Sequence, residues 1–164
     1  MSREIALEPL TAEAFAPYGD VIETHGEPSF QINAGMCDRF HDLARVDFDG
    51  EGSRIGISAG RGRPYALPYE LTMVERHPYG SQAFLPMSED PFMVIVAAEE
   101  AGTPGRPRAF ITNGRQGVNY LRGVWHGVLT PLGRTADFVI VDRIPTAGNL
   151  EEHHYDAPWS IVEA

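Results

Sequence analysis

Short hydrophobic segments separated by turn-forming residues make up most of the chain. The segments are rich in Val, Ile, Phe and Tyr, and the 17 Gly and 13 Pro residues fall mainly between them. This spacing is typical of a β sandwich or barrel. It predicts strands over residues 20–23, 54–59, 69–76, 82–87, 92–97, 108–112, 117–121, 124–129 and 136–142.

The same pattern supports only one helix. Thr11 can cap a short run over residues 12–16, and Glu13 lies near the positive end of that run. Asn113-Gly114 predicts a turn between two strands, because both residues tolerate positive φ. Residues 99–107, with their Gly and Pro, predict an exposed loop. Apolar residues in the last twenty positions should dock the tail.

Size and charge narrow the class of protein. A chain of 164 residues, 43% hydrophobic and 22% charged, suits one globular domain over residues 1–164. Its formal charge of −10 and scattered basic residues argue against nucleic acid as a partner. Every basic residue is an arginine, so Schiff-base chemistry on a lysine is excluded.

Cysteine usage and hydropathy indicate a location. Cys37 is the only cysteine, which excludes an intrachain disulfide and fits a reducing compartment. The first residues carry no apolar signal-peptide core, and the longest apolar run, residues 91–98, is too short to cross a bilayer. We therefore expect a cytoplasmic protein without a membrane partner.

The first candidate site lies in residues 75–86. His77, Tyr79 and Gln82 have a spacing that resembles the first cupin motif, in which two histidines and a glutamate bind a divalent metal. Tyr79 and Gln82 stand where the second histidine and the glutamate are expected. Both are poor ligands compared with imidazole and carboxylate, so the usual metal cage is damaged.

Two further segments carry candidate chemistry. Residues 117–126 resemble the second cupin motif, and the closing His126 shares strand parity with Val124 and should point inward. A histidine in such a place is a structural core residue about half the time. Arg39 and His41 share one face of an extended segment, where Arg39 either holds a substrate carboxylate or makes a surface ion pair.

Together these segments resemble the bacterial ureidoglycolate lyase family. The most specific string is residues 110–120, and further matches lie within residues 9–23, 32–44, 75–87, 124–126 and 137–143. The resemblance implies a mainly β, cupin-like double-stranded β-helix, a jelly-roll barrel with one or two short helices, usually a homodimer. It also implies cleavage of ureidoglycolate to glyoxylate and urea in purine degradation through allantoin. Leu121 and Gly127 replace histidines common in the family, which leaves His126 as the candidate.

The chemistry of ureidoglycolate suggests roles for these residues. Its central carbon carries a hydroxyl, a carboxylate and a urea nitrogen, so cleavage needs a base for the hydroxyl proton and an acid for the departing nitrogen. His126 and His77 are the candidates for proton transfer. The candidate substrate-binding residues are Arg39 or, less favourably, Arg76 for the carboxylate, Gln82 and Asn119 for the urea group, and Tyr120.

Such a reaction needs no cofactor, because it only moves protons. The alternative is a divalent metal ion, for example nickel, held by His77, Gln82 and His126. Two other functions stay open: a metal-dependent cupin enzyme that acts on another small acid, and a cupin that binds a small acid without catalysis. The reaction products and the metal content would distinguish them.

Overall fold

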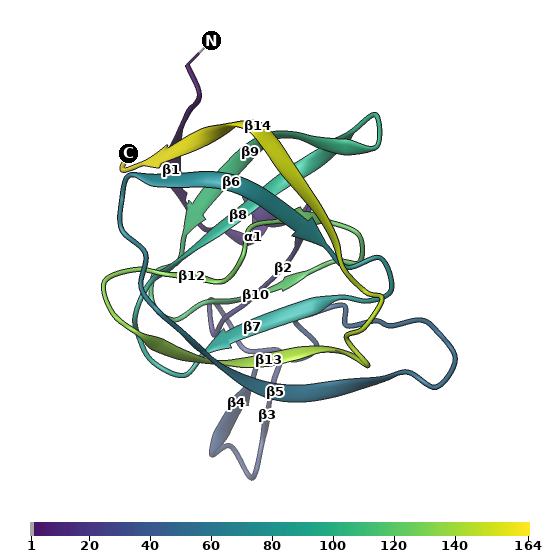
Figure 1. The fold of residues 1–164 in the computed structure, drawn as a ribbon. Helices are drawn as coiled ribbons and strands as arrows, with labels where there is room; N and C mark the ends of the chain where they lie inside the picture. Colours follow the sequence, from purple (N-terminus) through teal and green to yellow (C-terminus); the bar gives the residue numbers. More distant parts are fainter. Residues whose placement is uncertain (1) are drawn as a thin grey trace.

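The computed structural model describes residues 2–164 and is built almost entirely of β-strands (Figure 1). A seven-stranded sheet packs against a five-stranded sheet, and the two-stranded β3–β4 hairpin projects beyond the second sheet. No helix in residues 2–164 is long and apolar enough to span a membrane. The elements are β1 (Glu4–Pro9), α1 (Ala12–Phe15), β2 (Gly19–Ile22), β3 (Phe30–Ile32), β4 (Cys37–Arg39), β5 (Arg54–Gly62), β6 (Tyr69–Arg76), β7 (Gln82–Pro86), β8 (Phe92–Glu100), β9 (Thr103–Ile111), β10 (Gly117–Tyr120), β11 (Trp125–His126), β12 (Thr130–Pro131), β13 (Ala136–Ile144) and β14 (Glu151–Val162).

The seven-stranded sheet closes on itself. Its order is β11-β6-β14-β1-β9-β8-β12, and the two-residue strand β11 also pairs with β8. Six strands therefore form a closed barrel, with β1 parallel to both of its neighbours. The second sheet has the order β2-β10-β7-β13-β5. This architecture confirms the mainly β, cupin-like barrel predicted from the sequence.

Alternation along β8 separates two hydrophobic cores. Met93 and Ile95 point into the closed barrel, where every strand of the ring contributes a buried side chain. Val94 and Val96 point to the other side and form a second core against the five-stranded sheet. Because β8 is buried on both faces, it is a continuous apolar run and not an alternating one.

The predicted helix forms, one residue shorter than expected. The Thr11 hydroxyl accepts a hydrogen bond from the backbone N–H of Ala14 at 3.1 Å, as an N-cap does. Phe15 then reaches the second core, fully buried, with its ring 5.9 Å from that of Phe110 and 6.1 Å from that of Tyr120. The helix thus flanks the barrel and closes one end of the second core.

Several sequence predictions were wrong in detail. Residues 99–107 do not form a loop: β8 and β9 continue to a two-residue turn at Ala101 and Gly102, whose φ angles are 51° and 85°. Both residues adopt the left-handed conformation that tight hairpins need. The strand predicted over residues 124–129 is reduced to β11. Strands β1, β3, β4, β12 and β14 were not predicted, and β14 docks the tail between β1 and β6.

Gly19 allows a close approach that supports the second core. A Cβ at this position would lie 1.9 Å from the backbone oxygen of Asn119, whereas a Cβ at Gly60 would meet only the side-chain end of Ile140. Gly19→Ala is therefore expected to lower the free energy of unfolding by about 2 kcal/mol or more, measured by urea denaturation. Gly60→Ala, in the same sheet, should cost less, and equal losses would contradict this account.

Candidate active site

Strand pairing brings polar side chains to one end of the second core. On β11, His126 pairs with Glu75 of β6 on one side and with Val96 of β8 on the other. Directly paired residues face the same side of a sheet, so His126 and Glu75 join Val96 in facing the five-stranded sheet. His77 lies two residues beyond Glu75, and its ring is centred 5.1 Å from that of His126.

The five-stranded sheet supplies the facing side chains. Gln82 of β7 pairs with Tyr120 of β10 and with Asp142 of β13, so these three share a face. The Tyr120 ring stacks on the His126 imidazole, with centroids 4.1 Å apart and planes 6° from parallel. Burial raises the pKa of Tyr120 well above its usual value, so its hydroxyl stays protonated.

A cavity of about 410 Å³ opens at this cluster. Strand residues form one part of its wall, and the connection between β13 and β14 forms the rest. This volume lies within the range of small-molecule sites. The lining residues are Glu75, His77, Gln82, Asp142, Arg143, Thr146, Ala147, Gly148, Asn149 and Leu150.

Each ring nitrogen of His77 lies at hydrogen-bonding distance from a carbonyl oxygen. Nδ1 lies 2.8 Å from the backbone oxygen of Asn149, and Nε2 lies 3.0 Å from Oε1 of Gln82. Both partners are carbonyl oxygens, which can only accept, so each of these hydrogen bonds requires a hydrogen on the histidine nitrogen. The side chain is 15% exposed, which leaves it within reach of a ligand in the cavity.

His126 lies behind the cavity wall and stays neutral. It is 1% exposed, its Nδ1–H donates to the backbone oxygen of Gly127 at 2.9 Å, and its Nε2 has no partner among residues 2–164. Burial, together with the nearby His77, lowers the pKa of His126 to about 3. A buried imidazole with a free lone pair therefore stands beside the site.

Glu75 brings a carboxyl group beside the two histidines. Burial raises the pKa of Glu75, an effect that His77 partly offsets and Glu152 increases. Its Oε1 is 3.9 Å from Nε2 of His77. A carboxyl group with a raised pKa beside an imidazole nitrogen that faces an acceptor is an arrangement suited to proton transfer.

The cupin resemblance implies a divalent metal, and distances alone allow one. Glu75, His77 and His126 each place one potential ligand atom within 4.8 Å of the others. The Nε2 lone pair of His126 suits such a ligand. His77 does not, because both of its nitrogens face carbonyl oxygens at hydrogen-bonding distance, where a metal ion would have to replace the contact, and Oε1 of Gln82 is one of these oxygens. The residues as arranged do not fit a metal.

Arg76 faces away from the cavity, contrary to the role considered for it. It lies between Glu75 and His77 in the sequence, and alternation directs it to the opposite face. Its guanidinium stacks 4.3 Å above Trp125 and pairs with Glu99 and Glu151. The two glutamates already neutralise the charge of Arg76.

Arg39 lies at a different groove, so the prediction that it joins the histidines was wrong. It belongs to the separate β3–β4 hairpin, and its guanidinium is 5.8 Å from the Phe30 ring. The groove beside it, about 560 Å³, is larger than the cavity at His77. Its walls are mainly apolar and include no histidine, so the candidate chemistry stays in the smaller cavity.

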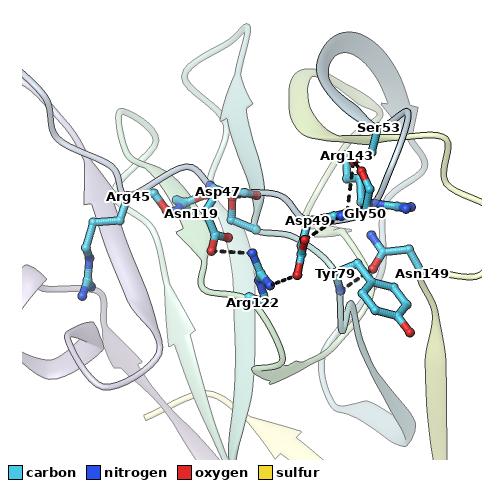
Figure 2. Close-up of polar contacts among 11 residues, drawn as sticks. Arg45, Asp47, Asp49, Gly50, Ser53, Tyr79, Asn119, Arg122, Arg143 and Asn149 are labelled. Atoms are coloured by element: carbon cyan, nitrogen blue, oxygen red, sulfur yellow. Dashed lines mark hydrogen bonds and ion pairs between the residues drawn. The ribbon is translucent and has the colours of Figure 1, made fainter.

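Asn119 is also absent from the cavity. It neighbours Tyr120 on β10 and therefore points to the opposite face. There its Nδ2 donates to Asp20 at 3.1 Å and to the backbone oxygen of Arg45 at 3.3 Å; Figure 2 shows Asn119 beside Arg45. Tyr79, at the position where the cupin motif expects a histidine, is exposed and does not line the cavity.

The segment over residues 45–53 packs along the turn that links His77 to Gln82. Arg122 pairs with Asp47 at 2.9 Å and with Asp49 at 3.4 Å (Figure 2). Arg143 donates to the backbone oxygens of Asp49 and Pro145, each at 2.7 Å. These contacts fix Arg143, the only arginine that lines the cavity, between the segment and the end of β13.

Sequence reasoning missed most of the cavity wall, including Glu75, Asp142, Arg143 and Asn149. Glu75 could have been found, because it shares strand parity with His77. Asp142, Arg143 and Asn149 come from the far end of the chain, and only the pairing of β13 with β7 brings them to His77. The histidines, Gln82 and Tyr120 are the predicted residues that the structure does gather.

Comparison with known proteins identifies the family. The family model described as ureidoglycolate lyase matches residues 2–162. The chain is 57% identical to a ureidoglycolate lyase of Chelativorans sp. over 159 residues, which cover 97% of this chain and 96% of that protein. It is 54% identical to the ureidoglycolate lyase of Rhodobacter capsulatus over 157 residues, 96% and 97% of the two chains. The chain belongs to the ureidoglycolate lyase family.

Proposed function

We propose that this protein cleaves ureidoglycolate to glyoxylate and urea. The observation that carries the proposal is the acid–base pair of Glu75 and His77 at the wall of a cavity of about 410 Å³. The names of the relatives support the choice of substrate, because each is a ureidoglycolate lyase.

Glu75 acts as the base and His77 as the acid. The Glu75 carboxylate takes the hydroxyl proton of the substrate, and the carbonyl of glyoxylate forms as the carbon–nitrogen bond breaks. The electron pair of that bond goes to the urea nitrogen, which takes a proton from Nε2 of His77. The raised pKa of Glu75 makes it a stronger base than an ordinary carboxylate.

The remaining groups hold the substrate and support the base. Arg143 brings a positive charge to the cavity wall for the substrate carboxylate, in place of Arg39. The Gln82 amide faces the urea group, which needs both donors and acceptors. The Nε2 lone pair of neutral His126 can accept a hydrogen bond from the Glu75 carboxyl group after it is protonated, and Tyr120 fixes the His126 ring by stacking on it.

Product analysis tests this function. Purified protein incubated with racemic ureidoglycolate should release glyoxylate and urea in equal amounts, above a protein-free background. Ammonia in place of urea would indicate amidohydrolase chemistry and contradict the proposal. Binding of ureidoglycolate without turnover would favour the non-catalytic alternative.

We also propose that catalysis needs no metal, since the proton transfers are assigned to side chains. The same assay after dialysis against a chelator should give an unchanged rate. Activity that disappears on dialysis and returns with nickel would favour the metal-dependent alternative. In that case Glu75 and the free Nε2 of His126 are the ligands at hand.

The homodimer and the cytoplasmic location expected from the sequence remain proposals. Five of the exposed large hydrophobic side chains fall within residues 30–48, around the projecting β3–β4 hairpin, and they support a protein interface in this part of the chain. These side chains are Phe30, Met36, Leu43, Val46 and Phe48, which are 36–86% exposed.

A further inference from the structure

We propose that Asp142 is a positioning residue, which acts through Gln82 to keep a hydrogen on Nε2 of His77. The inference rests on the proposed function in one respect, since His77 is the acid in that reaction. Asp142 does not act on the substrate itself. It determines which end of the Gln82 amide faces His77, and thereby which form of the His77 ring the site holds.

The contacts form a chain of three side chains. Nε2 of Gln82 donates to Oδ2 of Asp142 at 3.1 Å, and Oε1 of Gln82 lies 3.0 Å from Nε2 of His77. Asp142 and Gln82 occupy directly paired positions on β13 and β7, so the strands themselves hold the two side chains together. All three residues line the cavity.

The direction of these hydrogen bonds follows from the chemistry of the groups. An ionised carboxylate only accepts, so it must face the NH2 end of the amide. The amide oxygen then has to face His77, and because this oxygen also only accepts, His77 must present an N–H at Nε2. The backbone oxygen of Asn149 imposes the same condition at Nδ1.

The opposite amide orientation would change the imidazole. The NH2 group of Gln82 would then face His77, whose Nε2 would have to accept with a lone pair. Nδ1 would keep its hydrogen on Asn149, so His77 would hold no transferable proton at Nε2. Asp142 therefore keeps a hydrogen on Nε2 of His77 until the substrate displaces Gln82 from this nitrogen.

Asp142→Asn is the first variant of the test. An asparagine offers either a donor or an acceptor to Gln82, so the amide is no longer fixed. We expect kcat to fall by about tenfold to a hundredfold, within the range for general acid catalysis, while KM changes by about threefold or less. In 15N NMR spectra, Nε2 of His77 should move from the N–H region toward that of an unprotonated nitrogen.

Gln82→Glu in the Asp142→Asn background provides the decisive comparison. The carboxylate introduced at position 82 would accept from the amide introduced at position 142 and from Nε2 of His77. The original direction of hydrogen bonding therefore returns, with the carboxylate moved by one position along the chain of contacts. We expect the double variant to recover the N–H signal and most of the lost kcat, with a raised KM because the Gln82 amide no longer faces the urea group. Gln82→Glu alone places two carboxylates side by side without a donor between them, so its kcat should be lower than that of the double variant.

Asp137→Asn is the matched control. Asp137 lies on the same strand but on the other face, in an exposed bidentate pair with Arg61. Its replacement should leave kcat and the His77 spectrum unchanged.

The spectra separate this inference from the proposed function. If the wild-type protein does not cleave ureidoglycolate, the signals of His77 in the wild type and in Asp142→Asn still test the amide orientation. An unprotonated Nε2 in the wild type would overturn the inference. So would a double variant that resembles Asp142→Asn in its spectrum, since a merely structural role predicts no recovery.

Discussion

Glu75→Gln is expected to lower kcat by about a hundredfold to ten-thousandfold, the range for loss of a general base. Glutamine keeps the shape of the side chain and cannot take the hydroxyl proton. Steady-state kinetics with ureidoglycolate would measure the loss. Glu151→Gln is the control, because Glu151 pairs with Arg76 on the opposite face of the sheet, and it should retain kcat.

The pH dependence of the wild type should identify Glu75 more directly. The base must be ionised, so kcat/KM rises with pH as the carboxyl loses its proton. Because burial raises the pKa of Glu75, this rise should lie above the usual range of a glutamate, and it should be absent from the residual activity of Glu75→Gln. A rise that survives in the variant would assign the base to another group.

Stability provides a control for the same variant. A raised carboxyl pKa means that the folded state binds the proton more tightly than the unfolded state, so this group costs stability as pH rises through its titration. Glu75→Gln removes that cost and should be at least as stable as the wild type at pH 7. A strongly destabilised variant would contradict the view that the buried, ionised Glu75 carboxylate costs stability.

His126 should make the protein sensitive to acid. Its pKa is about 3 in the folded protein, against 6.5 for a histidine free of such burial. Between these values the unfolded state binds a proton and the folded state does not. Stability from this histidine is complete above pH 6.5 and is lost as pH falls toward 3. Each pH unit in that window costs about 1.4 kcal/mol, or about 2 kcal/mol between pH 6.5 and 5.

Urea denaturation over a series of pH values would measure this effect. His126→Asn can still donate to Gly127 but has no titrating ring, so its unfolding free energy should fall less steeply between about pH 6.5 and 5. Its stability at pH 7 should be lower, since the stacking on Tyr120 is lost. His154→Asn is the control, because the His154 side chain is 69% exposed and should leave the slope unchanged. Equal slopes in all three proteins would contradict a buried neutral His126.

The fold was predictable where strands are apolar on one or both faces. The segments at β6, β7, β8 and β13 carry their own signal, because their Val, Ile, Leu and Phe residues are typical of strands with at least one buried face. Strand β14 is rich in His, Glu and Pro, and only its pairing with β1 and β6 makes it a strand. Partners so distant in the sequence leave no local pattern.

The site was predictable to the extent that strand parity was applied. Parity correctly directed His126 inward, and applied strictly it would have excluded Arg76 and Asn119, which each adjoin a residue that faces the site. Arg39 required knowledge of where a separate hairpin packs, and Asp142 required the register of β13 on β7. The position of the hairpin and the register of β13 are both known only from the tertiary structure.

The smallest strand of the barrel has the widest influence. The two residues of β11 join β6 to β8, and one of them, His126, pairs directly with Glu75. If β11 separated from β6, the barrel would open and Glu75 would lose its place beside His126. Closure of the barrel and the arrangement of the site therefore depend on the same two residues, which limits the substitutions that β11 can accept.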